Sequence, residues 1–348
     1  MRINERHGFH IALSVALLAA MALACSCGGT RKRAETGRPP LIGFSLDSLV
    51  VERWRRDVDI FTRSARELGA DVILRVADQD HAIQERQIRE LANAGIDVLV
   101  VVPNDADRLS TVISEVRARG IRVLSYDRLV RNAAVDLYVS FDNQKVGRLM
   151  AEAIAQSVPK GGFIIINGAR SDNNAMMLNA GIHGVLDPLL ASGAMRLAGE
   201  IWPTTWDSDE VKEALERLLE SNREIDAVIA GNDMLAEAAI SVLSENRLMG
   251  DVMIASQDAE LAACQRIAEG SQYATVYKPI ERLALKAAGY AVMLAKGEDI
   301  KTDSVINDGR YDVPYVRLEP ILVTKDLLDS TVIKDGFHAA ADVYRNVR

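Results

Sequence analysis

Histidine and cysteine are scarce in this 348-residue chain, which contains five histidines and three cysteines. His7 and His10 lie near the amino end, and His81, His183 and His338 are widely separated. The sequence has no H-E-x-x-H, no G-x-S-x-G and no paired Cys/His ligands. We therefore expect no metal, no cofactor and no enzyme activity, although a carboxylate pair for glycoside hydrolysis stays open as an alternative.

Glycine-rich phosphate loops and a positive net charge are also missing. The glycine pair in "KGG" (160–162) precedes an expected strand, whereas a phosphate loop links a strand to the following helix. The net charge of −8 argues against a general nucleic-acid binder, because such proteins bind by neutralising phosphates. With 49% hydrophobic and 26% charged residues the composition is globular, and the length allows two domains.

The apolar run at the amino end is too short to span a membrane comfortably, which takes roughly 20 residues. "IALSVALLAAMALA" (11–24) has 14 residues and follows the basic residues Arg2 and Arg6. Basic residues, a short apolar run and small residues are typical of an export signal. A core helix is the alternative, but the run has no amphipathic period. We expect residues 1–24 to be a signal peptide and the protein to be exported.

Two of the three cysteines directly follow this run. "ALAC" (22–25) resembles a bacterial lipoprotein signal, in which Cys25 would be lipidated, although Ala22 and Leu23 stand in a less usual order. Residues 25–40 form a polar tether without periodicity, which suits a membrane-anchored domain. Plain cleavage to a soluble protein is the alternative. The third cysteine, Cys264, has no partner for an internal disulfide and is expected to be a small buried side chain.

From residue 41 onward, apolar runs alternate with stretches of helical spacing. Runs rich in β-branched residues suit parallel strands that are buried on both faces. The expected strands are "LIGFSL" (41–46), "DVILRVA" (71–77), "DVLVVVP" (97–103), "IRVLSYD" (121–127), "FIIING" (163–168), "RLAGEIW" (196–202), "DAVIAGN" (226–232), "DVMIASQD" (251–258) and "ATVYK" (274–278). The pattern predicts an α/β fold with open parallel sheets.

The two halves of the chain repeat one another. The stretches that begin at Ile96 and Ile225 each run Ile-Asp, apolar strand, Asn-Asp, helix, second strand and a final Asp. Two similar lobes follow from this repeat. We expect an N-terminal lobe of residues 41–145 plus about 279–315, and a C-terminal lobe of 146–278 plus about 316–348.

Polar and aromatic side chains gather where these strands end. In open α/β sheets ligands bind outside the carboxyl ends of the strands. The candidates there are Arg53, Trp54, Asp127, Arg128, Asp172, Asn173, Asn174, Trp206, Asn232, Gln257, Asp258 and Lys278. Sugar hydroxyls both donate and accept, so a sugar site combines carboxylates and amides with cations, and indole rings cover the apolar faces of the ring.

Each of these residues also has an ordinary structural interpretation. Asp127, Asp172 and Asp258 could cap helices. At helical i,i+4 spacing, Arg53 could pair with Asp57, Arg55 with Asp59, and Glu52 with Arg56. We favour pairing for Arg55 and Arg56, and leave both roles open for Arg53.

Several long stretches resemble bacterial periplasmic sugar-binding proteins of the ribose/galactose type, above all those that bind D-xylose for an ABC importer. They include "RDVDIFTRSARELGADV", "LSYDRLV", "VSFDNQKVG", "DNNA", "IDAVIAGND", "SQDAELA", "TVYKPI" and "STVIKDGFH". The resemblance implies two Rossmann-like lobes joined by a multi-crossover hinge, the type I periplasmic binding protein fold. It also implies that Arg53, Arg128, Asp172, Asn174, Asn232, Asp258 and Lys278 hydrogen-bond the sugar, while Trp54 and Trp206 stack on it. "PTTWDSDE" and "GARSDNN" depart from the family pattern beside Trp206 and Asp172.

The implied function is to bind a monosaccharide, D-xylose in the first place, and to deliver it as a monomer to a membrane permease. A sensor that reports to a histidine kinase or chemoreceptor is the alternative, because both roles use the same closure of the lobes. A LacI-type repressor shares the fold, but the export signal stands where its DNA-binding headpiece would be. No nucleic-acid partner is expected.

Overall fold

The computed structural model describes residues 38–51, 53–221 and 224–347. The predicted signal peptide, both tether cysteines and Glu52 lie outside the described residues. No helix within the described ranges is both long and apolar enough to cross a membrane.

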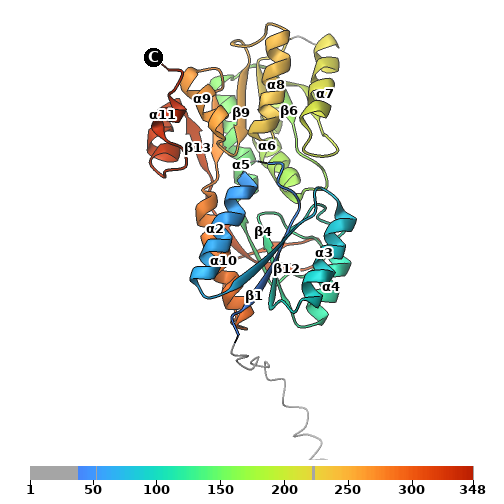
Figure 1. Cartoon of the computed structure of the whole chain (residues 1–348). Coiled ribbons are helices and arrows are strands. Elements are labelled where there is room, and N and C mark those ends of the chain that lie inside the picture. The colour runs from blue at the N-terminus through green and yellow to red at the C-terminus, as the bar shows by residue number, and fades with distance from the viewer. Residues whose placement is uncertain (1–37, 52, 222–223, 348) are drawn as a thin grey trace, which may run out of the picture. The chain divides into compact units, whose positions relative to one another are not determined.

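A seven-stranded sheet forms the first lobe (Figure 1). Its strand order is β11-β12-β5-β4-β3-β1-β2, and every neighbouring pair is parallel except β11 with β12. The bounds are β1 Leu41–Leu46, β2 Asp71–Val76, β3 Val98–Val102, β4 Arg122–Tyr126, β5 Leu137–Phe141, β11 Ser304–Asn307 and β12 Asp312–Leu318. On one face of the sheet α2 (Arg53–Glu67) and α10 (Ile280–Ala295) share an apolar core, and α3 (His81–Asn93) and α4 (Ser110–Ala118) cover the other.

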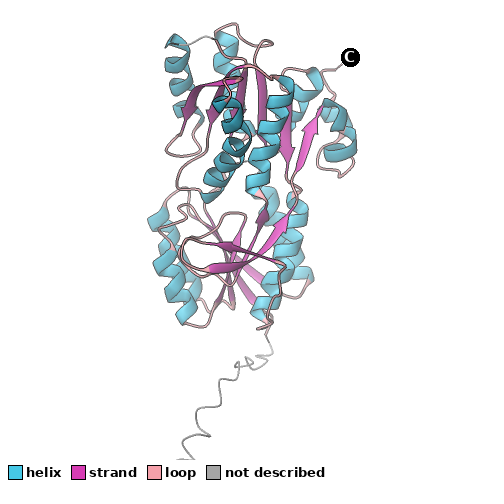
Figure 2. Cartoon of the chain, turned by 180° about the vertical axis from the view of Figure 1, so that it is seen from behind, coloured by secondary structure: helices cyan, strands magenta, loops and turns pink. Residues whose placement is uncertain are grey.

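A six-stranded sheet forms the second lobe, again between helices (Figure 2). Its order is β13-β10-β9-β8-β6-β7, with only β13 antiparallel to its neighbour. The strand bounds are β6 Gly161–Ile166, β7 Met195–Ile201, β8 Ala227–Ala230, β9 Met253–Gln257, β10 Ala274–Tyr277 and β13 Ile321–Thr324. The helices are α5 Asn143–Ser157, α6 Asn173–Ala191, α7 Ser208–Ser221, α8 Asp233–Glu245, α9 Leu261–Glu269 and α11 Ala340–Val343. A 3-10 turn Lys325–Leu327 and a π-helical turn Asp329–Ile333 follow β13.

The sequence predicts a strand most directly where helices bury both faces of that strand. β3 reads "VLVVV" and all five residues are inaccessible to solvent, because α10 covers one face and α3 and α4 the other. The expected strands match observed ones to within a few residues at each end. β5, β11, β12 and β13 were not among the expected strands. β5 was missed because a loop (127–136) rather than a helix connects it to β4 and breaks the expected alternation of strand and helix.

The chain passes between the two sheets three times. The crossings lie between β5 and α5, between β10 and α10, and between β12 and β13. Each lobe is therefore assembled from segments far apart in sequence, and three connecting segments of the chain join the lobes. The limits of the two lobes as moving bodies remain a prediction.

Candidate functional site

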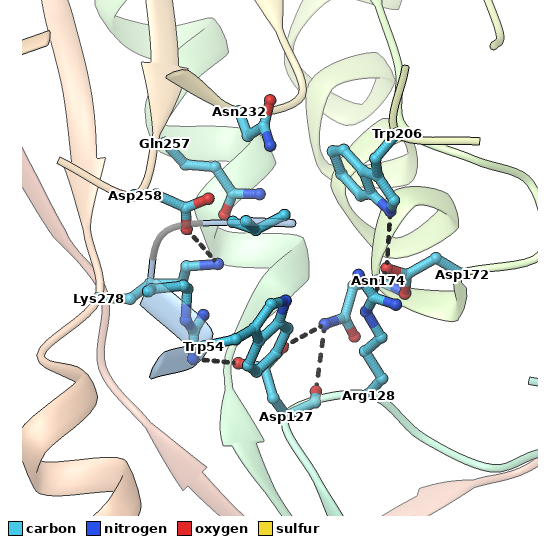
Figure 3. A pocket seen from close by; sticks show the side chains of 12 residues that line it. Trp54, Asp127, Arg128, Asp172, Asn174, Trp206, Asn232, Gln257, Asp258 and Lys278 are labelled. Atoms are coloured by element: carbon cyan, nitrogen blue, oxygen red, sulfur yellow. Dashed lines mark hydrogen bonds and ion pairs between the residues drawn. The ribbon is translucent and has the colours of Figure 1, made fainter. Parts of the chain in front are cut away.

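One pocket lies at the carboxyl ends of strands from both sheets (Figure 3). It is lined by Val51, Arg53, Trp54, Asp127, Arg128, Asp172, Asn174, Trp206, Asn232, Gln257, Asp258 and Lys278. All nine side chains that the sequence analysis assigned to a sugar are among them. Asp127 and Gln257 were noted as strand-end candidates but not assigned a contact, and Val51 was missed because a single valine carries no sequence signal.

Two of the lining residues also cap helices. Asp172 is the N-cap of α6 and accepts a hydrogen bond from the Asn174 backbone N–H at 2.9 Å. Asn232 is the N-cap of α8 and accepts from Leu235 N–H at 2.9 Å. Capping and pocket lining are therefore compatible, because the cap uses one acceptor and fixes the direction of the side chain. Asp258 caps no helix, since α9 begins at Leu261 after the N-cap Glu260.

Three cation–carboxylate pairs balance the charge of the pocket. Arg53 Nη2 lies 2.9 Å from Asp127 Oδ2, and Lys278 Nζ lies 2.8 Å from Asp258 Oδ1. The third pair joins the two lobes, because Arg128 Nε of the first lies 2.7 Å from Asp172 Oδ2 of the second. All six side chains are buried, so each charge depends on its partner for compensation.

The two pocket carboxylates that pair with arginines respond differently to burial. Burial alone would raise the pKa of Asp127, but the charges of Arg53 and Lys278 outweigh it and hold that pKa below its ordinary value. For Asp172 burial outweighs the attraction of Arg128, and the pKa is raised. Asp127 is thus a firmly ionised acceptor, whereas the charge of Asp172 relies on Arg128.

Buried carboxylates behind the pocket hold its arginines in place. Asp57 accepts from Arg53 Nε at 3.0 Å and also from the Tyr126 hydroxyl. Asp47 accepts from Arg128 Nη1 at 2.9 Å. The i,i+4 pair of Arg53 with Asp57 is therefore real, and it coexists with the position of Arg53 in the pocket.

The pairing expected for Arg55 is wrong. Among the described residues Arg55 and Asp59 form no ion pair, and Arg55 is exposed. The pairing of Arg56 with Glu52 stays a prediction, because Glu52 lies outside the described residues. Arg56 donates through Nη1 to the Phe337 carbonyl at 3.0 Å, with its guanidinium 4.6 Å from the Phe337 ring centroid. A contact so distant in sequence cannot be read from helical spacing.

Asn174 ties the two lobes together. Its Nδ2 donates to the backbone oxygen and to Oδ1 of Asp127, each at 3.1 Å, and its Oδ1 accepts from Asn143 Nδ2 at 3.0 Å and from the Tyr138 hydroxyl at 3.3 Å. The amide is fully engaged, so a ligand that binds Asn174 must replace some of these bonds.

Two indole rings approach the pocket from opposite lobes. Trp54 lies beneath two guanidinium groups, with Arg53 Cζ 4.6 Å and Arg128 Cζ 5.5 Å from its ring centroid. Trp206 donates through Nε1 to Asp172 Oδ2 at 3.2 Å. Its ring lies so close to Gly168 that a Cβ there would come within 2.3 Å, which requires glycine.

Three buried polar atoms of the pocket have no hydrogen-bond partner within the described part of the chain. They are Trp54 Nε1, Gln257 Oε1 and Asp258 Oδ1. Asp258 Oδ1 meets the ion-pair distance to Lys278 but not hydrogen-bond geometry. The amide of Gln257 is oriented by a bond from its Nε2 to Gly231 O at 2.7 Å. One donor and two acceptors are therefore open to hydrogen bonds from a bound molecule in a single small space, while Asp258 Oδ1 keeps its ion pair with Lys278.

The cavity between these side chains has a volume of about 30 Å³. That is room for roughly two water molecules. A larger ligand would require the side chains from the two lobes to move apart. The described residues contain no group of three or more His, Cys, Asp or Glu side chains arranged to hold a metal ion.

Cys264, the cysteine of the described chain, lies in α9 and is fully buried. Burial raises the pKa of its thiol. This is the small buried role that the sequence predicts for Cys264.

Comparisons with known proteins agree with this architecture. Residues 42–299 match the family model described as "Periplasmic binding protein domain". The chain is 46% identical over 304 residues to the D-xylose-binding periplasmic protein of Haemophilus influenzae, covering 87% of this chain and 92% of that protein. It is 44% identical over 303 residues to the D-xylose-binding periplasmic protein of Escherichia coli K12, with the same coverage of both chains.

Solved structures share the fold as well. The carbohydrate transporter solute binding protein of Chloroflexus aurantiacus, in complex with D-glucose, is 27% identical with a TM-score of 0.81, covering 86% of this chain and 97% of that chain. The two helix-covered, mostly parallel sheets joined by three crossings are the type I arrangement that the sequence resemblance implied. The chain belongs to the periplasmic binding protein domain family.

Proposed function

We propose that this protein binds a monosaccharide, D-xylose in the first place, in the pocket between its lobes and delivers it to an ABC permease. The relatives that are 44–46% identical are named for D-xylose binding in the periplasm. The role is binding without catalysis, and the site of action is the periplasm.

The observation that carries the proposal is the set of unsatisfied atoms around Trp54. A sugar hydroxyl can accept from Trp54 Nε1 and donate to Gln257 Oε1 or Asp258 Oδ1. Bonds to the ionised Asp258 would be charge-assisted. The indole faces of Trp54 and Trp206 supply apolar area for the C–H faces of a pyranose.

Closure follows from the contacts between the lobes. The Arg128–Asp172 ion pair and the Asn174–Asp127 bonds hold the lobes together, while the cavity is too small for a pyranose. We therefore propose that the lobes separate about the three crossings, admit the sugar and close on it. A ligand that touches both lobes favours the closed form by its additional contacts there.

The lipid anchor remains part of this proposal. "ALAC" and the polar tether support lipidation at Cys25, which would hold the binding domain near its permease.

The test is a binding panel on residues 38–348, which contain both sheets and all their core clusters. Tryptophan fluorescence and melting temperature are followed against xylose, ribose, arabinose, glucose and galactose. A ligand that binds only the folded chain raises the melting temperature with its occupancy. A response to xylose supports the proposal, and silence to every sugar at millimolar concentration overturns it.

A further inference from the structure

One buried carboxylate of the second lobe lies next to the pocket in sequence and forms no part of its wall. Asp233 is the first residue of α8, directly follows the pocket residue Asn232, and is fully buried. Its side chain is not among those that line the pocket. Burial of an ionisable group costs free energy unless hydrogen bonds compensate it, so the contacts of Asp233 must account for its position.

Four groups donate hydrogen bonds to this carboxylate. The Glu260 backbone N–H donates to Oδ2 at 2.8 Å, and the Thr275 hydroxyl donates to Oδ1 at 3.0 Å. The Ser256 hydroxyl also donates to Oδ1, and the Gln272 amide donates to it at 3.5 Å. These donors lie on β9, on β10 and in the two segments that flank α9. Asp233 therefore ties the start of α8 to the neighbouring strands and turns of its lobe.

Two of these contacts hold the turn that carries Asp258. The Glu260 N–H binds Asp233 directly. The Ala259 N–H donates to the Thr275 hydroxyl at 3.2 Å, and this hydroxyl in turn donates to Asp233. The two backbone N–H groups that follow Asp258 are thus anchored on one carboxylate, the first through a hydroxyl and the second directly.

The backbone of this turn needs an anchor because it is strained. Asp258 and Ala259 have positive φ angles of 101° and 54°, a region that residues other than glycine rarely adopt. Such a conformation persists only where the surrounding contacts fix it. Here it directs Asp258 into the pocket, where Oδ1 lies 2.8 Å from Lys278 Nζ.

The equivalent turn of the first lobe is held in another way. The backbone oxygen of Asp127 accepts from the hydroxyls of Tyr138 at 2.9 Å and Ser140 at 2.6 Å. Asp105, the counterpart of Asp233 in the internal repeat, is only half-buried. It accepts from backbone N–H groups two and three residues further along its own loop, at 2.9 and 3.1 Å. The anchor on Asp233 is therefore particular to the second lobe and does not follow from the repeat.

We propose that Asp233 is a positioning residue for sugar binding, which fixes the 258–260 turn and thereby aims the Asp258 carboxylate at the ligand without touching the ligand itself. This inference rests on the proposed monosaccharide function and adds to it a residue outside the pocket wall.

The experiment measures the dissociation constant of D-xylose by calorimetry on residues 38–348. Asp233→Ala removes both anchors and should weaken xylose at least about tenfold, because the charge-assisted bond to Asp258 loses its direction. Asp233→Asn keeps an acceptor for the Glu260 N–H at nearly the same volume, so it should restore the affinity to within about fivefold of the parent.

The matched control is a buried carboxylate at the opposite end of a strand. Asp97 precedes β3 and accepts from the Leu41 backbone N–H at 2.8 Å. Asp97→Ala removes a buried acceptor from a backbone N–H, as Asp233→Ala does, and should lower the melting temperature. Xylose should nevertheless bind within about twofold of the parent, because no residue of the pocket wall depends on this contact.

Two hydroxyl variants test the same link even if Asp233→Ala does not fold. Thr275→Val removes the hydroxyl that holds the Ala259 N–H and should weaken xylose about fivefold. Ser256→Ala removes another hydroxyl that donates to the same carboxylate, but this hydroxyl binds Asp233 and Gln272 instead of the turn. It should leave the affinity for xylose within about twofold.

A double-mutant cycle shows whether the anchor acts through Asp258. In a chain that already carries Asp258→Asn, the charge-assisted bond is absent, so Thr275→Val should weaken xylose by less than about twofold more. Equal fold-losses from Thr275→Val with and without Asp258→Asn would overturn the link between the two residues.

The outcomes separate this inference from the proposed function. If the parent chain binds no sugar, the monosaccharide function is overturned and the role of Asp233 with it. If the parent binds xylose and both Asp233→Ala and Thr275→Val bind it equally well, the function stands and the inference is wrong. Losses of the same size in Asp97→Ala or Ser256→Ala would show that reduced stability weakens binding, and would also overturn the inference.

Discussion

Asp127 and Asp258 occupy equivalent positions in the two halves of the chain. Each follows a parallel strand, has a positive φ of 61° or 101°, and donates its backbone N–H at 2.9 Å to the neighbouring strand, at Val139 O or Val276 O. Aspartate tolerates this left-handed region better than most residues, and such strain concentrates at functional sites. The internal repeat thus places one carboxylate from each lobe in the same pocket, each beside a cation.

The carboxylate of Asp258 is expected to be essential for sugar binding. Asp258→Asn keeps the shape but removes a charged acceptor whose Oδ1 lacks a hydrogen bond in the pocket. Loss of a charge-assisted bond should weaken D-xylose roughly 10- to 100-fold in a calorimetric titration. Asp251→Asn makes the same chemical change at an exposed position and serves as the control. Equal affinity in the two variants would contradict the assigned role.

The indole N–H of Trp54 is expected to donate to the ligand. Trp54→Phe keeps an aromatic face but removes the unsatisfied donor Nε1, so xylose should bind about fivefold more weakly. Trp202→Phe is the matched control, because Trp202 is outside the pocket wall and its Nε1 already donates to Glu200 at 3.0 Å. Titration of both variants decides the point, and a Trp54→Phe chain that binds xylose as tightly as the parent would show that Nε1 does not contact the sugar.

Arg56 is expected to stabilise the chain where Arg55 does not. Arg56 joins α2 to the C-terminal segment through the Phe337 carbonyl and ring. One hydrogen bond and one cation–π contact together suggest a loss of about 1–2 kcal/mol in the free energy of unfolding for Arg56→Ala. Arg55→Ala removes the same charge from an exposed neighbour, and it should change the free energy of unfolding by less than about 0.5 kcal/mol. Urea unfolding measures both, and indistinguishable midpoints would rule the contact out as a stabilising one.

The buried carboxyl of Asp233 should make stability depend on pH. Burial raises its pKa from 3.8 to about 7, although Ser256 and Thr275 donate to it. Between these values the folded chain holds a proton that the unfolded chain has lost. The stabilisation of the folded chain by protonated Asp233 is therefore fully present below the ordinary pKa and disappears as pH rises through about 7.

The free energy of unfolding should accordingly fall by up to ~1.4 kcal/mol per pH unit across that window through Asp233 alone. Asp233→Asn cannot titrate, so the slope of stability against pH should flatten by this amount. Denaturant unfolding at pH 4.5, 5.5, 6.5 and 7.5 tests it. If the free energy of unfolding has the same slope against pH in the parent and in Asp233→Asn, Asp233 does not cause the pH dependence.

Lipidation at Cys25 is a prediction about residues outside the described ranges. Cells that express the intact chain and are fed radioactive palmitate should label it, and Cys25→Ala should abolish the label. Cys27→Ala is the matched control, because this cysteine lies two residues further on and should leave the label in place. Absence of label from the unsubstituted chain would contradict the anchor.

The pocket residues could be predicted because they follow parallel strands. Strand ends are visible in sequence as the point where an apolar run stops, and the topology brings those ends to one edge of each sheet. Trp54, Asp172 and Lys278 were found in this way, each from a different strand end. Of the residues behind them, Asp57 was noted as a possible i,i+4 partner of Arg53, and the structure confirms that pair. Asp47 directly follows β1 but was not recognised, because it acts on the pocket only through Arg128.

The sequence by itself determined the class of fold, the repeated lobes and the chemical character of the site, because these depend on local periodicity and on residue types at strand ends. Only the tertiary structure decided which charges pair, that Asn174 and Arg128 bridge the lobes, and that Arg56 contacts Phe337. Those features join residues distant in sequence, and their energies depend on distance and burial, which no local pattern encodes.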